Sequence, residues 1–141
     1  MIKKSGSAKW DGGLKTGGGT VSTQSGALKD QPYGFNTRFE GVAGSNPEEL
    51  LGAAHAACFS MALSLMLEQA GIKNTSVETT SEISLEPDPA GGFKVTKAHL
   101  VTKISGDGDR DEMLRLAGEA ETGCPISKVL NAEISLDATV V

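Results

Sequence analysis

The fold is decided by residues 46–71, which read NPEELLGAAHAACFSMALSLMLEQAG. Asn46 is a preferred N-cap residue, Pro47 suits the first helical position, and the two glutamates that follow carry negative charge where the helix dipole favours it. Residues 51–67 contain no charged side chain, and Gly71 suits the position just after a helix end. The stretch therefore predicts one long helix with a defined start and a defined end.

The apolar run of this helix approaches the lower limit of a membrane span, but basic and aromatic flanks are missing. We therefore expect no membrane partner and a helix buried on most of its sides within protein. Small residues such as Gly52 and Ala56 would allow another helix to approach closely. One small sheet would not cover such a helix, so a dimer core is expected.

The rest of the chain alternates between strand and helix patterns. Glycine-marked turns separate short strand-like pieces at 7–10, 20–23 and 35–39, which together predict an N-terminal antiparallel meander. The following residues predict a hairpin of strands at 77–85 and 93–104, with a bulge between Val95 and Ala98. They also predict a helix at 109–120, a helical turn at 125–130 and a closing strand at 134–140. This order predicts an α+β fold in a single domain spanning residues 1–141.

Composition narrows the function before any motif is considered. Thirteen basic and 18 acidic side chains give a net charge of −5, so no basic stripe is available for nucleic acid. The charged N-terminus is not followed by an apolar run, which predicts a cytoplasmic protein without a signal peptide. Structural disulfides are rare in the cytoplasm. The two cysteines are therefore either buried thiols or reactive ones.

The residues alone favour Cys124 as the more reactive thiol. Pro125 suits the first position of a helix, which puts Cys124 at the N-cap, where amides and the helix dipole lower a thiol pKa. Cys58, in the apolar helix, resembles a small core residue. His55 lies one helical turn from Cys58 and is either a base for its thiolate or, as we favour, a structural histidine. A metal site would need further ligands, and His99 in a strand does not complete one.

Arg38 and Glu48 are candidate site residues whose access to a cysteine depends on the tertiary structure. Arg38 would supply a fixed positive charge that stabilises a thiolate. Glu48 precedes Cys58 by ten positions, a rise of about 15 Å along one helix. The two side chains cannot meet in a straight helix. If Glu48 serves a site at Cys58, it must come from a partner chain or from a strongly bent segment.

Two motifs together carry a family resemblance. Residues 46–59, NPEELLGAAHAACF, resemble the central-helix motif of the OsmC/Ohr family, and residues 123–128, GCPISK, resemble its second cysteine motif. The resemblance covers essentially the whole chain and is closer to the OsmC branch. It implies a thiol-dependent peroxidase of the oxidative stress response, acting on organic hydroperoxides and less well on hydrogen peroxide. It also implies an intertwined homodimer with active sites at the interface.

The resemblance further assigns roles to individual residues. Cys58 would be the peroxidatic nucleophile and Cys124 the resolving thiol, with a Cys58–Cys124 disulfide as intermediate. Arg38 and Glu48 would orient and activate Cys58. An apolar lining would bind substrate beside Arg38; its expected members are Leu50 and Phe59, together with Phe35, Phe39 and Leu51. A dithiol, with a lipoylated protein as one candidate, would reduce the disulfide, and no metal, haem or flavin would be required.

Two other function classes stay open at this point. A cysteine hydrolase would use Cys58 with His55 as its base and would not require Cys124. A redox sensor or binding module would oxidise once and show no turnover with excess dithiol.

Overall fold

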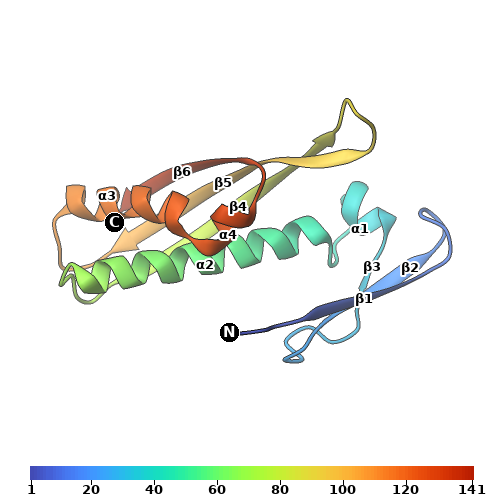
Figure 1. The fold of residues 1–141 in the computed structure, drawn as a ribbon, viewed down its shortest axis with the longest axis horizontal. Helices are drawn as coiled ribbons and strands as arrows, with labels where there is room; N and C mark the ends of the chain where they lie inside the picture. The colour runs from blue at the N-terminus through green and yellow to red at the C-terminus, as the bar shows by residue number, and fades with distance from the viewer. The chain divides into compact units, whose positions relative to one another are not determined.

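The computed structural model describes residues 1–141 and divides into two compact units, Met1–Leu50 and Leu51–Val141 (Figure 1). The long helix α2 (Pro47–Gln69) begins in the first unit and continues in the second. The elements confirm the predicted α+β class. One domain over the whole chain stays a prediction.

The first unit contains the predicted antiparallel meander. Strands β1 (Gly6–Asp11), β2 (Gly18–Thr23) and β3 (Gln31–Tyr33) form one sheet in that order. Both pairs of neighbouring strands are antiparallel. The third strand therefore lies several residues before the position that we predicted for it.

The predicted strand at residues 35–39 is wrong, because this segment is the short helix α1 (Phe35–Phe39). Thr37 caps its start: the Gly34 N–H donates to Thr37 Oγ1 at 2.9 Å, and the Thr37 hydroxyl donates to the Gly34 carbonyl at 3.0 Å. Phe35 and Phe39, four residues apart, bring their rings together at 4.9 Å between centroids. That spacing fits one face of a helix, whereas the prediction assumed the alternation of a strand.

Both predicted ends of α2 are confirmed. The Asn46 side-chain oxygen accepts a hydrogen bond from the Glu49 N–H at 2.9 Å, as an N-cap residue should. Gly71 has a φ of 75° and donates its N–H to the Glu68 carbonyl at 2.9 Å. This left-handed conformation closes the helix and suits a residue without a Cβ.

The predicted burial of α2 on most sides is not met within one chain. One stripe is buried, and its members are Gly52, His55, Phe59, Leu63 and Leu67. Met61 and Leu65 are 76% and 53% exposed, and only 28% of the most apolar window of the helix is buried. By length and composition alone, α2 is also apolar enough to cross a membrane, a property that core helices of soluble proteins share. The helix therefore carries an uncovered apolar face.

The second unit is built on a three-stranded sheet with order β4–β5–β6. Strands β4 (Ser76–Pro87) and β5 (Phe93–Ser105) form the predicted antiparallel hairpin, and β6 (Glu133–Val140) pairs in parallel with β5. The register shifts between Ser84 and Leu85, where β5 carries an additional residue opposite β4. This confirms the bulge predicted from the change in apolar phase.

Helices α3 (Arg110–Gly123) and α4 (Pro125–Val129) connect β5 to β6. Figure 1 shows α2 and α3 running alongside the sheet. The helices and the sheet enclose one core, formed by Phe59, Leu63, Leu67, Ile72, Leu100, Ile104, Met113, Leu116, Ala117, Ala120 and Cys124. Cys124 is thus both a core residue and the first residue of the turn into α4.

Close packing of α2 on β4 gives a first prediction. A Cβ added to Gly52 would lie 2.6 Å from the Ser81 carbonyl oxygen, whereas a Cβ on Gly118 in α3 would meet no atom within 4 Å. We expect Gly52→Ala to lower the free energy of unfolding by about 1–3 kcal/mol, because the helix and strand must move apart. Gly118→Ala, the matched control, should raise it by about 0.5–1 kcal/mol. Chemical denaturation measures both, and equal effects would contradict the close approach.

Candidate active site

The structure brings the two cysteines together. Cys58 lies in the middle of α2 and is half-buried, while Cys124 precedes α4 and is completely buried. Both thiols are free, and they lie close enough for each to shift the pKa of the other. Two cysteines that are distant in sequence are therefore neighbours in the fold.

Cys124 is surrounded by hydrogen-bond donors. It is the N-cap of α4, and the Ser127 N–H points to its sulfur at 3.5 Å. Burial alone raises the pKa of the Cys124 thiol. Hydrogen bonds from the Cys58 thiol, from Ser127 and from the Ile126 N–H outweigh burial and hold this pKa below its ordinary value. This agrees with the N-cap argument from the sequence.

Cys58 has the opposite electrostatic balance. Burial and the hydrogen bond to Cys124 raise the pKa of the Cys58 thiol, and the Ile126 N–H opposes them only in part. Because the two thiols interact, the first proton is lost from the pair rather than from one independent group. The opposite directions of the two pKa shifts favour the negative charge on Cys124, where the α4 amides lie. Within this unit, a thiolate on Cys58 gains no comparable stabilisation.

His55 is held by two serines rather than by a cysteine. Its Nδ1 lies 2.7 Å from Ser81 Oγ on β4, and its Nε2 lies 2.8 Å from Ser127 Oγ on α4. The ring is completely buried, and burial lowers the pKa of His55 from its ordinary value. His55 is therefore a neutral, partner-bonded histidine. Neither Ser81 nor Ser127 was predicted as a partner of His55, although Ser127 falls in the GCPISK motif.

Arg38 and Glu48 form a two-pronged ion pair in the first unit. Arg38 Nε lies 3.2 and 3.1 Å from the two Glu48 carboxylate oxygens, and Arg38 Nη2 lies 2.7 Å from Oε1. The Glu48 side chain is 15% exposed, against 35% for Arg38. Arg38 belongs to α1, where we expected a strand, and its carboxylate partner is Glu48 rather than Glu49. The pair presents one guanidinium with its orientation fixed.

The residues expected to bind substrate fall in different places. A hollow of about 260 Å³ adjoins Arg38 and is lined by apolar rings, including Trp10, Phe35 and Phe39. Leu50 lines a separate apolar hollow of about 160 Å³. Phe59 is completely buried in the core of the second unit and packs there. Of the expected apolar lining, Phe35 and Phe39 thus lie beside Arg38.

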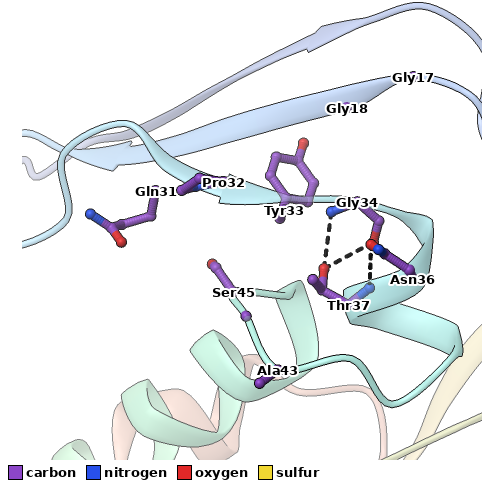
Figure 2. A pocket seen from close by; sticks show the side chains of 11 residues that line it. Gly17, Gly18, Gln31, Pro32, Tyr33, Gly34, Asn36, Thr37, Ala43 and Ser45 are labelled. Carbon is purple, nitrogen blue, oxygen red and sulfur yellow. Dashed lines mark hydrogen bonds between the residues drawn. The ribbon is translucent and has the colours of Figure 1, made fainter.

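A larger hollow of about 490 Å³ lies between the β3–α1 connection and the segment before α2 (Figure 2). Figure 2 shows Thr37 hydrogen-bonded to Gly34 and Asn36 at its wall. Ser45 also lines it, and its buried hydroxyl has no hydrogen-bond partner. No cysteine, histidine or charged residue lines this hollow. It therefore lacks the groups needed for thiol chemistry.

Metal ligation finds no support in the side-chain clusters. No group of three or more histidine, cysteine or acidic side chains is arranged to hold a metal ion. His99, on β5, instead contacts Ser135 Oγ at 2.6 Å and Asp137 Oδ2 at 3.2 Å. The chemistry that the site can perform is that of two adjacent thiols.

Comparison with known proteins identifies the family. The family model described as OsmC-like protein matches residues 40–139. Peroxiredoxin OsmC of Escherichia coli (strain K12) is 56% identical over 137 residues, covering 96% of this chain and 95% of the relative. The chain belongs to the OsmC-like protein family. The resemblance stated from the two motifs is thus confirmed.

Other members of this OsmC-like family extend the similarity to the fold. Organic hydroperoxide resistance protein OhrB of Bacillus subtilis (strain 168) is 32% identical over 119 residues, covering 84% of this chain and 85% of the relative. The crystal structure of OhrB of Bacillus subtilis matches with a TM-score of 0.70 at 28% identity, covering 97% of this chain and 98% of that one. The fold predicted from the sequence is therefore the fold of known relatives.

The buried neutral His55 predicts a specific pH dependence of stability. Its folded pKa lies below the unfolded value near 6.5, so below that pH the unfolded chain binds a proton that the folded chain does not. Stability from His55 is fully present above this value and is lost as the pH falls through the folded pKa. We expect His55→Gln to reduce the acid-side slope of unfolding free energy by up to about 1.4 kcal/mol per pH unit.

Denaturation of wild type and variant over a pH series measures this slope. Ser60→Ala is the matched control, because it removes the 2.8 Å hydrogen bond from α2 to Thr79 on β4 without removing a titratable group. The control should be less stable at every pH with an unchanged slope. A wild-type slope in His55→Gln would show that His55 does not supply this pH dependence.

Proposed function

We propose that this protein reduces organic hydroperoxides to alcohols, with Cys58 as the peroxidatic thiol and Cys124 as the resolving thiol. The observation that carries the proposal is the proximity of the two free thiols, which interact closely enough to shift each other's pKa. A sulfenic acid formed on either sulfur would have the other thiol within immediate reach.

The enzyme class rests on the relatives. The prediction of a peroxidase is confirmed by 56% identity with a protein named peroxiredoxin over nearly the whole chain. The relatives named organic hydroperoxide resistance proteins support alkyl hydroperoxides as the substrate class. The apolar hollow beside Arg38 agrees with a substrate that carries a hydrocarbon group.

The proposed reaction has three balanced steps. The Cys58 thiolate attacks the distal peroxide oxygen, the O–O bond breaks, and the alkoxide takes a proton to leave as alcohol, so that Cys58 becomes a sulfenic acid. Cys124 attacks the Cys58 sulfur, and water leaves as the disulfide forms. A dithiol then reduces the disulfide by two successive exchanges and is itself oxidised to a disulfide.

Arg38 is proposed to bind the peroxide and to supply the positive charge that Cys58 needs. Glu48 contacts Nε and Nη2 of the guanidinium, which leaves Nη1 directed to another edge for a peroxide oxygen. A fixed cation near the Cys58 sulfur would offset the burial that raises the pKa of this thiol. The ion pair and the thiol pair would then form one site.

A homodimer is proposed to bring these two pairs together. Glu48 and Cys58 are separated by about 15 Å along α2, so the Glu48 side chain does not meet the Cys58 of its own helix. The uncovered face of α2, with Met61 and Leu65, offers an apolar surface for a second copy. Each site would then combine Cys58 and Cys124 of one chain with Arg38 and Glu48 of the other, in a cytoplasmic enzyme.

A cysteine hydrolase is less well supported. Both ring nitrogens of His55 are engaged by serine hydroxyls, so the ring is not free to accept a proton from Cys58. A sensor without turnover is distinguished by the following measurement.

Turnover with excess dithiothreitol and tert-butyl hydroperoxide tests the chemistry. Wild type should consume many equivalents of peroxide. Cys58→Ser should lose at least about a thousandfold in rate, because the nucleophile is removed. Cys124→Ser should still form one sulfenic acid per chain in a single turnover but fail to form the internal disulfide. Oxidation of wild type without turnover would favour the sensor, and activity in Cys58→Ser would refute the assignment.

Mixing two inactive variants tests the shared site. Cys58→Ser keeps Arg38, and Arg38→Ala keeps Cys58, so a mixed dimer rebuilds one complete site only if the two residues come from different chains. After subunit exchange we expect recovery of about a quarter of wild-type activity per chain, since random pairing leaves one complete site in half of the dimers. No recovery, with exchange verified by mass spectrometry, would place both residues of a site in the same chain.

A further inference from the structure

A series of polar side chains, half-buried at Ser81 and buried at His55 and Ser127, connects β4 to the Cys124 sulfur. Ser81 Oγ lies 2.7 Å from His55 Nδ1, and His55 Nε2 lies 2.8 Å from Ser127 Oγ. The Ser127 N–H points to the Cys124 sulfur at 3.5 Å, and the Ser127 side chain is among the groups that lower the pKa of Cys124. His55 and Cys124 are 0% exposed and Ser127 is 7% exposed, so water does not screen these contacts. The thiol chemistry proposed above does not use this arrangement.

The hydrogen bonds of this chain can all point in one direction. A Ser127 hydroxyl that donates to a Cys124 thiolate leaves its oxygen to accept from the His55 Nε2–H. A neutral imidazole protonated at Nε2 has Nδ1 as its acceptor, which suits the Ser81 hydroxyl as donor. Burial keeps His55 neutral. Each group then donates a hydrogen bond to the next, from Ser81 through His55 to Ser127, and the last hydrogen bond is donated to the Cys124 sulfur.

We propose that Ser81, His55 and Ser127 are positioning residues that hold Cys124 as a thiolate, and that they thereby make Cys124 the leaving sulfur when the disulfide is reduced. The inference deepens the proposed function, because it rests on a Cys58–Cys124 disulfide. It assigns the direction of the exchange reaction: the reductant attacks Cys58. The half-buried position of Cys58 and the complete burial of Cys124 favour the same direction.

Reduction of the Cys58–Cys124 disulfide proceeds by two successive thiol–disulfide exchanges. A thiolate of the dithiol attacks Cys58 Sγ, a mixed disulfide forms, and the Cys58–Cys124 bond breaks with its electron pair going to Cys124. The second thiolate of the reductant then attacks the reductant sulfur that is bonded to Cys58, which closes the reductant's ring and releases the Cys58 thiolate. The protein gains two electrons and the dithiol becomes a cyclic disulfide. A better-stabilised leaving thiolate speeds the first step.

Few titratable groups face the relay, the hydrogen-bonded series of Ser81, His55 and Ser127 that leads to Cys124. On α2 and around α4 these are His55, Cys58 and Cys124. Glu78 and Glu82 on β4 are exposed, and Ser81, between Thr80 and Glu82 on an alternating strand, faces the opposite side. Lys128 on α4 is exposed as well. The thiolate fraction of Cys124 should therefore report on the relay itself.

The first test titrates Cys124 by thiolate ultraviolet absorbance in a Cys58→Ser background, where it is the single thiol. Removing the hydroxyl with Ser127→Ala should lower the acid dissociation constant of Cys124 about tenfold, the effect of one lost hydrogen bond to a charged group. His55→Leu should lower it in the same direction. His55→Gln should restore part of the loss, because its amide N–H can still donate to Ser127.

The matched control is Ser60→Ala, which removes a hydrogen bond between the same two elements, α2 and β4, outside the relay. It should leave the Cys124 titration unchanged. An unchanged titration in Ser127→Ala, or an equal change in Ser60→Ala, would overturn the proposal. Should His55→Leu fail to fold, Ser127→Ala decides the outcome alone.

The second test follows opening of the disulfide, made with diamide in the two-cysteine protein and opened with β-mercaptoethanol. Alkylation and peptide mapping should find the mixed disulfide on Cys58 and the free thiol on Cys124. Ser127→Ala should slow opening of the disulfide about threefold, because the acid dissociation constant of the leaving thiol, Cys124, would be about tenfold lower. Capture on Cys124 in wild type would refute the direction of attack.

These measurements use no peroxide, so they are separable from the proposed peroxidase activity. Normal turnover with an unchanged Cys124 titration would reject the relay and keep the enzyme. A relay-dependent titration without peroxide turnover would keep the relay and reject the proposed substrate chemistry.

Discussion

Contact of one α2 stripe with β4 is the constraint from which the thiol site follows. Gly52 has no side chain, so the helix backbone can approach the Ser81 carbonyl more closely than any other residue would permit. One turn later, His55 meets the Ser81 hydroxyl, and at the next turn Cys58 points to Cys124. A shift of α2 by one residue would therefore lose both contacts. The position of α2 against β4 therefore determines both the helix packing and the environment of the two thiols.

The two thiols lie in different electrostatic surroundings although they touch. Cys124 receives the amides that begin α4, whereas Cys58 receives mainly the burial of a mid-helix position. The isolated pair thus favours the thiolate on the proposed resolving residue. The arginine proposed for this site would have a clear physical purpose, because a cation beside Cys58 would favour the thiolate on the sulfur that is proposed to attack the peroxide. The fixed orientation of Arg38 by Glu48 suits that task.

Local signals explain what the sequence predicted well. Asn46 and Gly71 define the ends of α2 through contacts with residues three positions away, and Cys124 caps α4 in the same way. The partners of His55 were not predictable by such reasoning, because they come from β4 and α4 and depend on how these elements pack. The strand prediction for residues 35–39 was wrong for another reason. The apolar residues alone fitted either a strand or a helix, and the capping contacts of Thr37 favour the helix. The Cys58–Cys124 pairing came from family resemblance and not from the spacing of the residues.

The exposed face of α2 connects stability with catalysis. A helix with Met61 and Leu65 in water retains apolar surface that association would bury at about 25 cal/mol per Å². The same association is what the proposed mechanism requires to bring Arg38 to a Cys58 thiol whose pKa is otherwise raised. A dissociated chain would then keep its peroxidatic sulfur protonated and slow to react with peroxide. Under this mechanism, dimer formation would bring Arg38 to Cys58 and thereby favour the Cys58 thiolate. The reactive thiolate would then form only in dimers, in which the apolar faces of α2 are covered.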